Sequence, residues 1–154
     1  PPVVSDPYLV GQVVRSGSTI AADAVELIGS AQSKLYLASS SIESPEVVKA
    51  LKAASERGVK LIILLWSDPA IPEDDERYLP RWLSNLPGAV VRVVDLPQRF
   101  SEKMMIIDDG AIFAFVGPLT ANEKALLFVL PKNSAIYHDY EEKLKPLASI
   151  GRKI

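Results

Sequence analysis

The chain has 154 residues, a length that suits one domain with its own hydrophobic core. Its 17 basic and 19 acidic side chains give a formal charge of -2, which gives no support to strong binding of DNA or another polyanion by the domain itself. The sequence has no cysteine, so disulfides, thiolate catalysis and cysteine-based zinc sites are excluded. We therefore expect a reducing, cytoplasmic setting and no metal or cofactor.

No segment of the sequence predicts a membrane span or a targeting peptide. The longest apolar run, residues 59–66, is far shorter than the roughly 20 residues that a membrane-spanning helix needs. The chain opens with Pro-Pro and has neither an initiator Met nor a signal-peptide pattern. We expect a single domain over residues 1–154, excised from a longer protein.

The first third of the chain predicts two helices around a strand. After a loose, Pro-containing start, Ser18 and Thr19 can cap a helix whose apolar residues recur every 3.6 positions over residues 20–31. The segment KLYLAS, residues 34–39, predicts a short buried strand. A second helix then has Ser44 as its N-cap and Pro45 in its first turn, and it ends at residues 57–58, Arg-Gly.

The middle of the chain continues the alternation of strands and helices. Residues 59–66, VKLIILLW, predict a central parallel strand that is covered on both faces. A Pro-rich acidic loop and an amphipathic stretch over residues 78–86 follow, with a helix that begins or kinks at Pro80. Residues 89–96 predict a third strand. Strands joined by helical crossovers favour a mostly parallel sheet.

The last third of the chain predicts a hairpin, a strand and a helix. Residues 103–107 and 111–116 predict two strands joined by Asp108-Asp109-Gly110, because Asp-Gly is a strong hairpin signal. Residues 125–130 predict a further strand. A last helix, capped by residues 133–134, is expected to bury Ile136, Tyr137, Tyr140 and Leu144. The predicted fold class is α/β, a three-layer sandwich whose mixed, mostly parallel sheet is flanked by helices.

Polar residues follow the predicted parallel strands, at the edge where open α/β sheets usually bind ligands. The ligand-binding candidates at this edge are Ser39, Ser41, Trp66, Asp68, Asp95, Arg99, Glu102, Lys103 and Thr120. The alternative interpretation is that they are ordinary polar strand ends, because loops are polar for reasons unrelated to function. Trp82 is expected to pack in the core on its helix.

The stretch SEKMMIIDDG, followed by FAFVG, resembles the signature of the phospholipase D superfamily, H-x-K-x4-D with a hairpin that returns to G-S-x-N. The spacing places Ser101 at the histidine, Lys103 at the lysine and Asp108 at the aspartate. The segment SPEVVKALKAASERGVKLIILL resembles the helix and strand that precede this motif. The resemblance covers residues 20–147 and implies a phospholipase D-like fold.

The same comparison implies that the chain lacks the family's nucleophile. In the family, phosphodiester cleavage proceeds through a phosphohistidine, whereas Ser101 has an unactivated hydroxyl with no base nearby in the sequence. The sole histidine, His138, lies in the predicted last helix, where we expect it to be exposed or partly packed. Residues 117–120, GPLT, replace G-S-x-N. The motif of Ser101, Lys103 and Asp108 is therefore expected to be degenerate and non-catalytic.

Histidine-lacking domains of this kind resemble the C-terminal effector domain of archaeal TrmB-type transcription regulators. The resemblance implies a non-catalytic regulatory domain that senses a small molecule, such as a sugar or a phosphate-containing compound, or forms a homodimer. Contact with DNA would come through an N-terminal domain that precedes this chain.

Two other functions remain open from the sequence. The chain could be a small phosphodiesterase or nuclease with an altered nucleophile, in which Lys103 holds phosphate and Asp108 orients it. It could also be a scaffold that binds another protein through the acidic loop at residues 68–76 and Trp82.

Overall fold

The computed structural model describes residues 11–39, 41–42, 44–66, 75–76, 80–95, 103–116, 124–132, 137–138 and 140–153. An eight-stranded sheet with the order β1-β7-β6-β5-β2-β3-β4-β8 forms its centre. The strands are β1 (Gly11–Ser16), β2 (Lys34–Ser39), β3 (Lys60–Trp66), β4 (Ala89–Val94), β5 (Lys103–Ile107), β6 (Ile112–Val116), β7 (Lys124–Leu130) and β8 (Arg152–Lys153).

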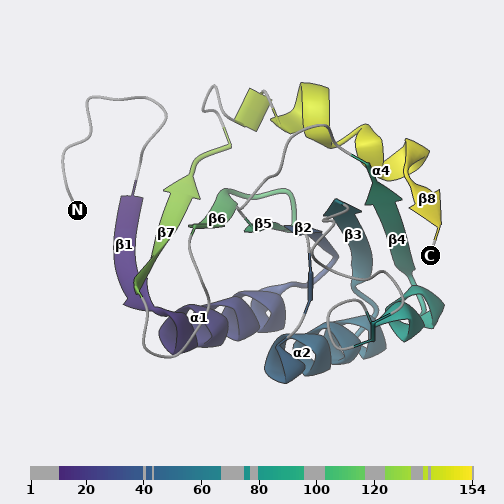
Figure 1. Cartoon of the computed structure of the whole chain (residues 1–154), viewed down its shortest axis with the longest axis horizontal. Coiled ribbons are helices and arrows are strands. Elements are labelled where there is room, and N and C mark those ends of the chain that lie inside the picture. Colours follow the sequence, from purple (N-terminus) through teal and green to yellow (C-terminus); the bar gives the residue numbers. More distant parts are fainter. Residues whose placement is uncertain are drawn as a thin grey trace.

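Helices cover both faces of this sheet, as Figure 1 shows. One face carries α1 (Gly17–Ser30) and α2 (Pro45–Glu56), and the other carries the C-terminal segment with η2 (Tyr140–Leu144, a π-helical turn) and α4 (Leu147–Ile150). A 3-10 turn, η1 (Arg81–Asn85), leads into β4. The predicted three-layer α/β sandwich is confirmed.

The sheet is mixed as predicted, but only its centre is parallel. The pairs β2-β3 and β3-β4 are parallel, whereas the other five pairs, β1-β7, β2-β5, β4-β8, β5-β6 and β6-β7, are antiparallel. Parallel neighbours need a long crossover, which the chain provides only before β3 and β4. The expectation of a mostly parallel sheet therefore holds for β2 to β4 alone.

The alternation of side chains along the strands builds two hydrophobic cores. Leu35 and Leu37 of β2 point toward α1 and α2, where they join Ile28 and Leu51 in the larger core. The intervening residues of β2 and β3 point to the opposite face, where they pack against the C-terminal segment. This second core contains Tyr36, Ala38, Leu64, Trp66, Ile106, Ile112, Ala114, Leu130, Tyr137 and Tyr140.

The second helix has the termini that its sequence predicts. Ser44 caps it by accepting a hydrogen bond from the Val47 N–H, and Pro45 occupies its first turn. Gly58 follows its end with a φ of +89°, a conformation that glycine adopts without a steric penalty. The strand predicted at residues 34–39 matches β2 at both ends.

Three elements differ from their predictions. Strand β1 lies in the stretch expected to be loose. It pairs with β7, whose residues are 108 to 118 positions further along the chain, and such a distant pairing leaves no local pattern in the sequence. In the described part of the stretch predicted to be helical, residues 80–86, the structure has the short turn η1, which begins directly after Pro80. The last helix buries Tyr137 and Tyr140 as expected, but η2 is a π-helical turn, and the predicted cap at residues 133–134 and Ile136 lie outside the described residues.

The prediction for Trp82 is wrong. Its side chain is 41% exposed, whereas the neighbouring Leu83 is only 2% exposed. A turn of five residues can direct only part of its surface to the core, and η1 uses Leu83 for that contact. Trp82 is therefore a surface residue.

Truncation of Leu51 tests the larger core. Leu51 is fully buried where α2 packs on the sheet, so Leu51→Ala should lower the free energy of unfolding by about 3 kcal/mol. The neighbouring Lys52 is exposed, and Lys52→Ala should change it by less than about 0.5 kcal/mol. Equal effects of the two variants in denaturant unfolding would contradict this arrangement.

Candidate functional site

Two of the candidate residues, Ser39 and Ser41, bond to each other where β2 ends. The Ser39 hydroxyl donates to the Ser41 carbonyl oxygen at 2.7 Å, and the Ser41 N–H donates to the Ser39 Oγ at 3.3 Å. Both residues are buried, at 1% and 5% exposure. Their polar groups thus hold the chain as it leaves the strand.

Lys103 begins β5 beside this turn. Because β5 runs antiparallel to β2 and Met104 pairs with Ala38, the same register places Lys103 opposite Ser39. Side chains alternate along β5, so Lys103 points to the same face as Met105, which is the face that α1 and α2 cover. The structure therefore brings together Lys103, Ser39 and Ser41 from the predicted set.

Trp66 and Asp95 do not join this group. Trp66 ends β3 and is buried on the opposite face of the sheet. Asp95 follows β4 and forms a two-point ion pair with Arg152 of β8, with distances of 3.1 and 3.2 Å. Three strand spacings, roughly 14 Å, separate the strand of Lys103 from that of Asp95. The residues predicted at this edge therefore do not form one site. Trp66 lies on the face opposite to Lys103, and Asp95 is held in an ion pair near the outer strand β8.

The other predicted site residues, Asp68, Arg99, Ser101, Glu102 and Thr120, lie outside the described residues.

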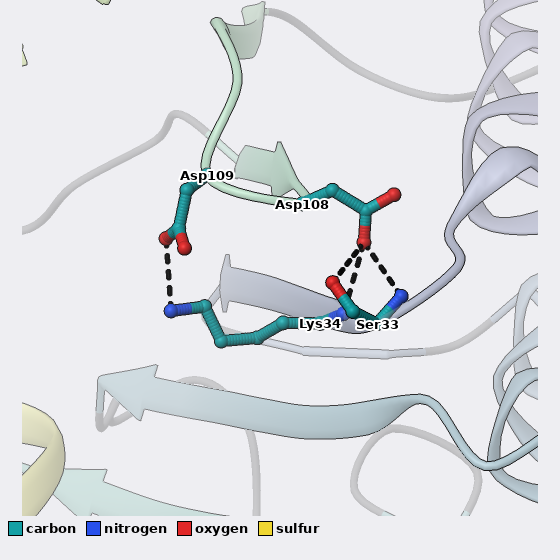
Figure 2. Close-up of polar contacts among 4 residues, drawn as sticks. All are labelled: Ser33, Lys34, Asp108 and Asp109. Carbon is teal, nitrogen blue, oxygen red and sulfur yellow. Dashed lines mark hydrogen bonds and ion pairs between the residues drawn. The ribbon is translucent and has the colours of Figure 1, made fainter.

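Asp108 directly follows β5, at the end opposite to Lys103. Figure 2 shows its contacts with Ser33 and Lys34. Its Oδ1 accepts hydrogen bonds from the Ser33 N–H at 2.8 Å, the Ser33 hydroxyl at 2.9 Å and the Lys34 N–H at 2.9 Å. Its Oδ2 accepts from the Gln32 N–H at 3.0 Å. One carboxylate therefore holds the three residues that lead from α1 into β2.

These donors hold the pKa of Asp108 far below its ordinary value of 3.8. The N–H of Lys34 has the largest influence, followed by the N–H groups of Ser33 and Gln32, because each one favours the charged carboxylate. Asp108 and Asp109 have φ angles of 51° and 58°, and the Gly110 N–H donates to the Ile107 carbonyl oxygen at 2.8 Å. The tight turn thus uses two aspartates in the left-handed region, which Asp tolerates better than most residues.

The position of Asp108 corrects one expectation. Five residue steps along β5, roughly 17 Å, separate it from Lys103, and its carboxylate bonds to the opposite edge of the sheet. It is therefore too far away to orient a phosphate that Lys103 holds within the same domain. Its role in this fold is to anchor the start of β2.

Asp109 adds a second contact from the same turn. Its Oδ1 lies 2.8 Å from the Lys34 Nζ, as Figure 2 shows. This hydrogen bond is the largest cause of the lowered pKa of Asp109, and the charges of Lys34, Lys145 and Lys132 contribute further. The two aspartates of the turn therefore bind the backbone and the side chain at the start of β2.

A cavity of about 380 Å³, which was not predicted from the sequence, lies on the face that the C-terminal segment covers. Its lining comprises Lys34, Tyr36, Lys60, Ile62, Val90, Arg92, Ile106, Asp109, Tyr137, Tyr140, Lys145 and Ser149. The sequence indicates part of this lining. Lys34 and Lys60 each begin a strand, and the alternation of side chains places them on the same face as Tyr36 and Ile62. The C-terminal side chains are brought there only by tertiary packing.

Tyr36 has an unusual environment in this cavity. Its side chain is only 3% exposed, and its hydroxyl has no hydrogen-bond partner in the part of the chain that the structure describes. A buried polar group without a partner is destabilising, so natural proteins rarely keep one without a reason.

Substitution of Asp108 tests its anchoring role. Asp108→Ala should lower the free energy of unfolding by about 2 kcal/mol, because it removes four hydrogen bonds and places alanine in a left-handed conformation, although water screens part of the effect at this exposed site. Chemical denaturation measures it, with Asp108→Asn as the variant that keeps the shape and removes the charge.

The pH dependence gives a second test of Asp108. Its pKa is lower in the folded chain than in the unfolded chain, so its stabilisation is complete above about pH 5 and is lost as the pH falls below about 4. The difference in unfolding free energy between wild type and Asp108→Asn should therefore shrink from pH 5 to pH 3. A difference that stays constant or grows over this range would contradict the anchoring role.

Tyr36→Phe tests the hydroxyl in the cavity. Removal of a buried hydroxyl that lacks a partner should raise the free energy of unfolding of the ligand-free protein by about 1 kcal/mol. A loss of stability in denaturant unfolding would show instead that the hydroxyl has a partner.

Comparison with known proteins places this fold in a family. The family described as "Cardiolipin synthase, PLD-like domain" matches residues 24–143, which is most of the chain. Curated protein sequences give no significant match. No helix in the described ranges is both long and apolar enough to cross a membrane.

Solved structures share the architecture at low sequence identity. Nuc, a phospholipase D family member from Salmonella typhimurium, has a TM-score of 0.70 and 17% identity over 94% of this chain and 99% of its own. NucT from Helicobacter pylori has a TM-score of 0.70 and 16% identity over the same shares. TrmBL2, an archaeal chromatin protein, has a TM-score of 0.57 and 22% identity over 93% of this chain and 54% of its own. The chain therefore belongs to the phospholipase D-like domain family.

Proposed function

We propose that this chain is a non-catalytic, cytoplasmic regulatory domain of a TrmB-like transcription regulator, which senses a small effector and acts as a homodimer. The observation that carries this proposal is the absence of the family's nucleophile, because Ser101 stands where the phospholipase D motif has histidine. A serine hydroxyl needs a general base to become a nucleophile, and the sequence around it provides none.

The position of the sole histidine supports this proposal. His138 is exposed and belongs to the C-terminal segment, next to Tyr137, which packs against the sheet face opposite to that of Lys103. An imidazole on that face is separated from Lys103 by the sheet. His138 is therefore a poor substitute for the missing group within one domain.

The structural similarity to TrmBL2 supports the regulatory context. It extends over 93% of this chain but only 54% of TrmBL2, whose description reports a novel mode of DNA binding. We propose that DNA contact belongs to an N-terminal domain of the parent protein, since this domain carries a formal charge of -2. Homodimer formation suits such a regulator, because two-fold symmetric proteins read two half-sites.

A phosphodiesterase with an altered nucleophile is the second candidate. The match to the cardiolipin synthase type of domain and the similarity to Nuc favour it, as does the retained Lys103. It is weaker because loss of a covalent nucleophile costs many orders of magnitude in rate, and because Asp108 is bound at the opposite edge of the sheet.

A scaffold role is favoured by one surface feature. The exposed Trp82 lines a groove of about 600 Å³ together with Pro80 and the first half of α2, including Glu46 and Lys49. Tryptophan is enriched among the residues that dominate protein interfaces. Trp82→Ala should then abolish the binding of the partner without unfolding the domain.

A hydrolysis assay separates the two main candidates. We expect wild type and Lys103→Ala to hydrolyse bis(p-nitrophenyl) phosphate at the same background rate, because neither has a nucleophile. Circular dichroism should first show that both proteins are folded. Activity in the wild type that disappears in Lys103→Ala would overturn the non-catalytic assignment.

A further inference from the structure

The cavity under the C-terminal segment gathers cationic side chains at the amino ends of the parallel strands. Lys34 and Lys60 are register partners in β2 and β3, so their backbones are one strand spacing apart, about 4.8 Å. Arg92 of β4 and Lys145, which follows η2, also line the cavity. This edge is opposite to the one that carries Lys103.

Only one of these cations forms an ion pair among the described residues, although the charge of Lys145 also acts on Asp109. Asp109 pairs with Lys34 at 2.8 Å. Lys60 and Lys145 form no ion pair within the described ranges, and the Arg92 Nη1 donates to the Val91 carbonyl oxygen at 3.1 Å. Among the described residues that line the cavity, four cationic side chains accompany one carboxylate, which leaves a surplus of positive charge there.

Tyrosines form the inner wall of the same cavity. The ring of Tyr36 meets that of Tyr140 edge to face at 5.1 Å, and Tyr140 meets Tyr137 at 5.7 Å. Burial raises the pKa of Tyr36 and Tyr140, so both hydroxyls remain protonated and can donate hydrogen bonds. The Tyr36 hydroxyl has no hydrogen-bond partner among the described residues.

The shape and lining of the cavity define a class of ligand. A volume of about 380 Å³ lies in the range of small-molecule sites. Ile62, Val90 and Ile106 give it an apolar floor beside the tyrosines, suited to the flat body of a ring. The surplus of lysine and arginine suits a group with more than one negative charge, and phosphate fits this requirement.

We propose that this cavity binds a small phosphate monoester with a ring-shaped body, such as a sugar phosphate or a nucleoside monophosphate. Lys60 and Lys145 bind the phosphate, and the ring lies against Tyr36 and the apolar floor. This inference rests on the proposed ligand-sensing function and gives it a location.

The side chains gain little in stability from this arrangement without a ligand. Lys60 begins its strand beside the like-charged Lys34, whose charge Asp109 offsets, and the Tyr36 hydroxyl is buried without a partner among the described residues. A bound phosphate would offset the lysine charges, and a polar substituent on its ring would offer the Tyr36 hydroxyl a partner after a small side-chain adjustment.

Thermal unfolding and calorimetric titration test this inference with glucose 6-phosphate and adenosine monophosphate, each beside its uncharged counterpart, glucose or adenosine. We expect at least one monoester to raise the melting temperature of the wild type and its counterpart to have a much smaller effect. Lys60→Gln and Lys145→Gln should each weaken binding about tenfold, the loss expected for one charge-assisted hydrogen bond. Tyr36→Phe should also weaken it while the ligand-free protein becomes more stable.

Two control variants locate the site. Lys52→Gln removes an exposed lysine on the opposite face, and Lys103→Ala removes the lysine of the motif; neither should change the affinity. Monoester binding that is lost in Lys103→Ala but retained in Lys60→Gln and Lys145→Gln would overturn this site and leave the ligand-sensing function standing. Equal binding of the charged and uncharged compounds would overturn the phosphate preference alone. If no compound binds in the millimolar range, both the cavity site and its sensing role are contradicted.

Discussion

The carboxylate of Asp108 is the contact on which the arrangement of the central sheet depends. It accepts hydrogen bonds from Gln32, Ser33 and Lys34, so the hairpin of β5 and β6 is fastened to the point where α1 passes into β2. This contact joins residues 74 to 76 positions apart. It fixes the junction between the parallel centre of the sheet and its antiparallel half, since β5 is the neighbour of β2.

This role gives a structural reason for the spacing of Lys103 and Asp108. In the stretch that resembles the phospholipase D signature, Asp108 is hydrogen-bonded to the backbone at the start of β2, at the end of β5 opposite to Lys103. The separation between Lys103 and Asp108 is the length of strand β5, so the two side chains lie at opposite ends of this strand. Retention of Lys103 and Asp108 therefore says less about phosphodiester chemistry than the spacing suggests. Ser101 is the position that bears on the chemistry, because the correct placement of the other groups does not substitute for a missing nucleophile.

The sequence predicted those parts of the fold that local patterns determine. The helix with Ser44 and Pro45 at its start and the strand KLYLAS were predicted closely because capping residues and apolar runs lie within each segment. Strand β1 and the antiparallel directions depend on pairing with β7 and its neighbours, which leaves no local pattern. The short turn η1 reflects Pro80, which prevents the amphipathic stretch from forming a longer helix.

The candidate site was predicted less completely than the fold. Ser39, Ser41 and Lys103 do meet at one edge, but the two serines bond to each other and Asp95 pairs with Arg152. The cavity with Lys60 and Tyr36 was missed because the rest of its lining comes from the C-terminal segment, through Tyr137, Tyr140, Lys145 and Ser149. Our central claim is that the working site of this domain lies in that cavity and not at the motif edge. The most direct measurement is an NMR titration of isotope-labelled protein with glucose 6-phosphate and adenosine monophosphate. We predict that one of them shifts the amide signals of Tyr36, Lys60 and Lys145, whereas shifts confined to Ser39, Ser41 and Lys103 would contradict the account.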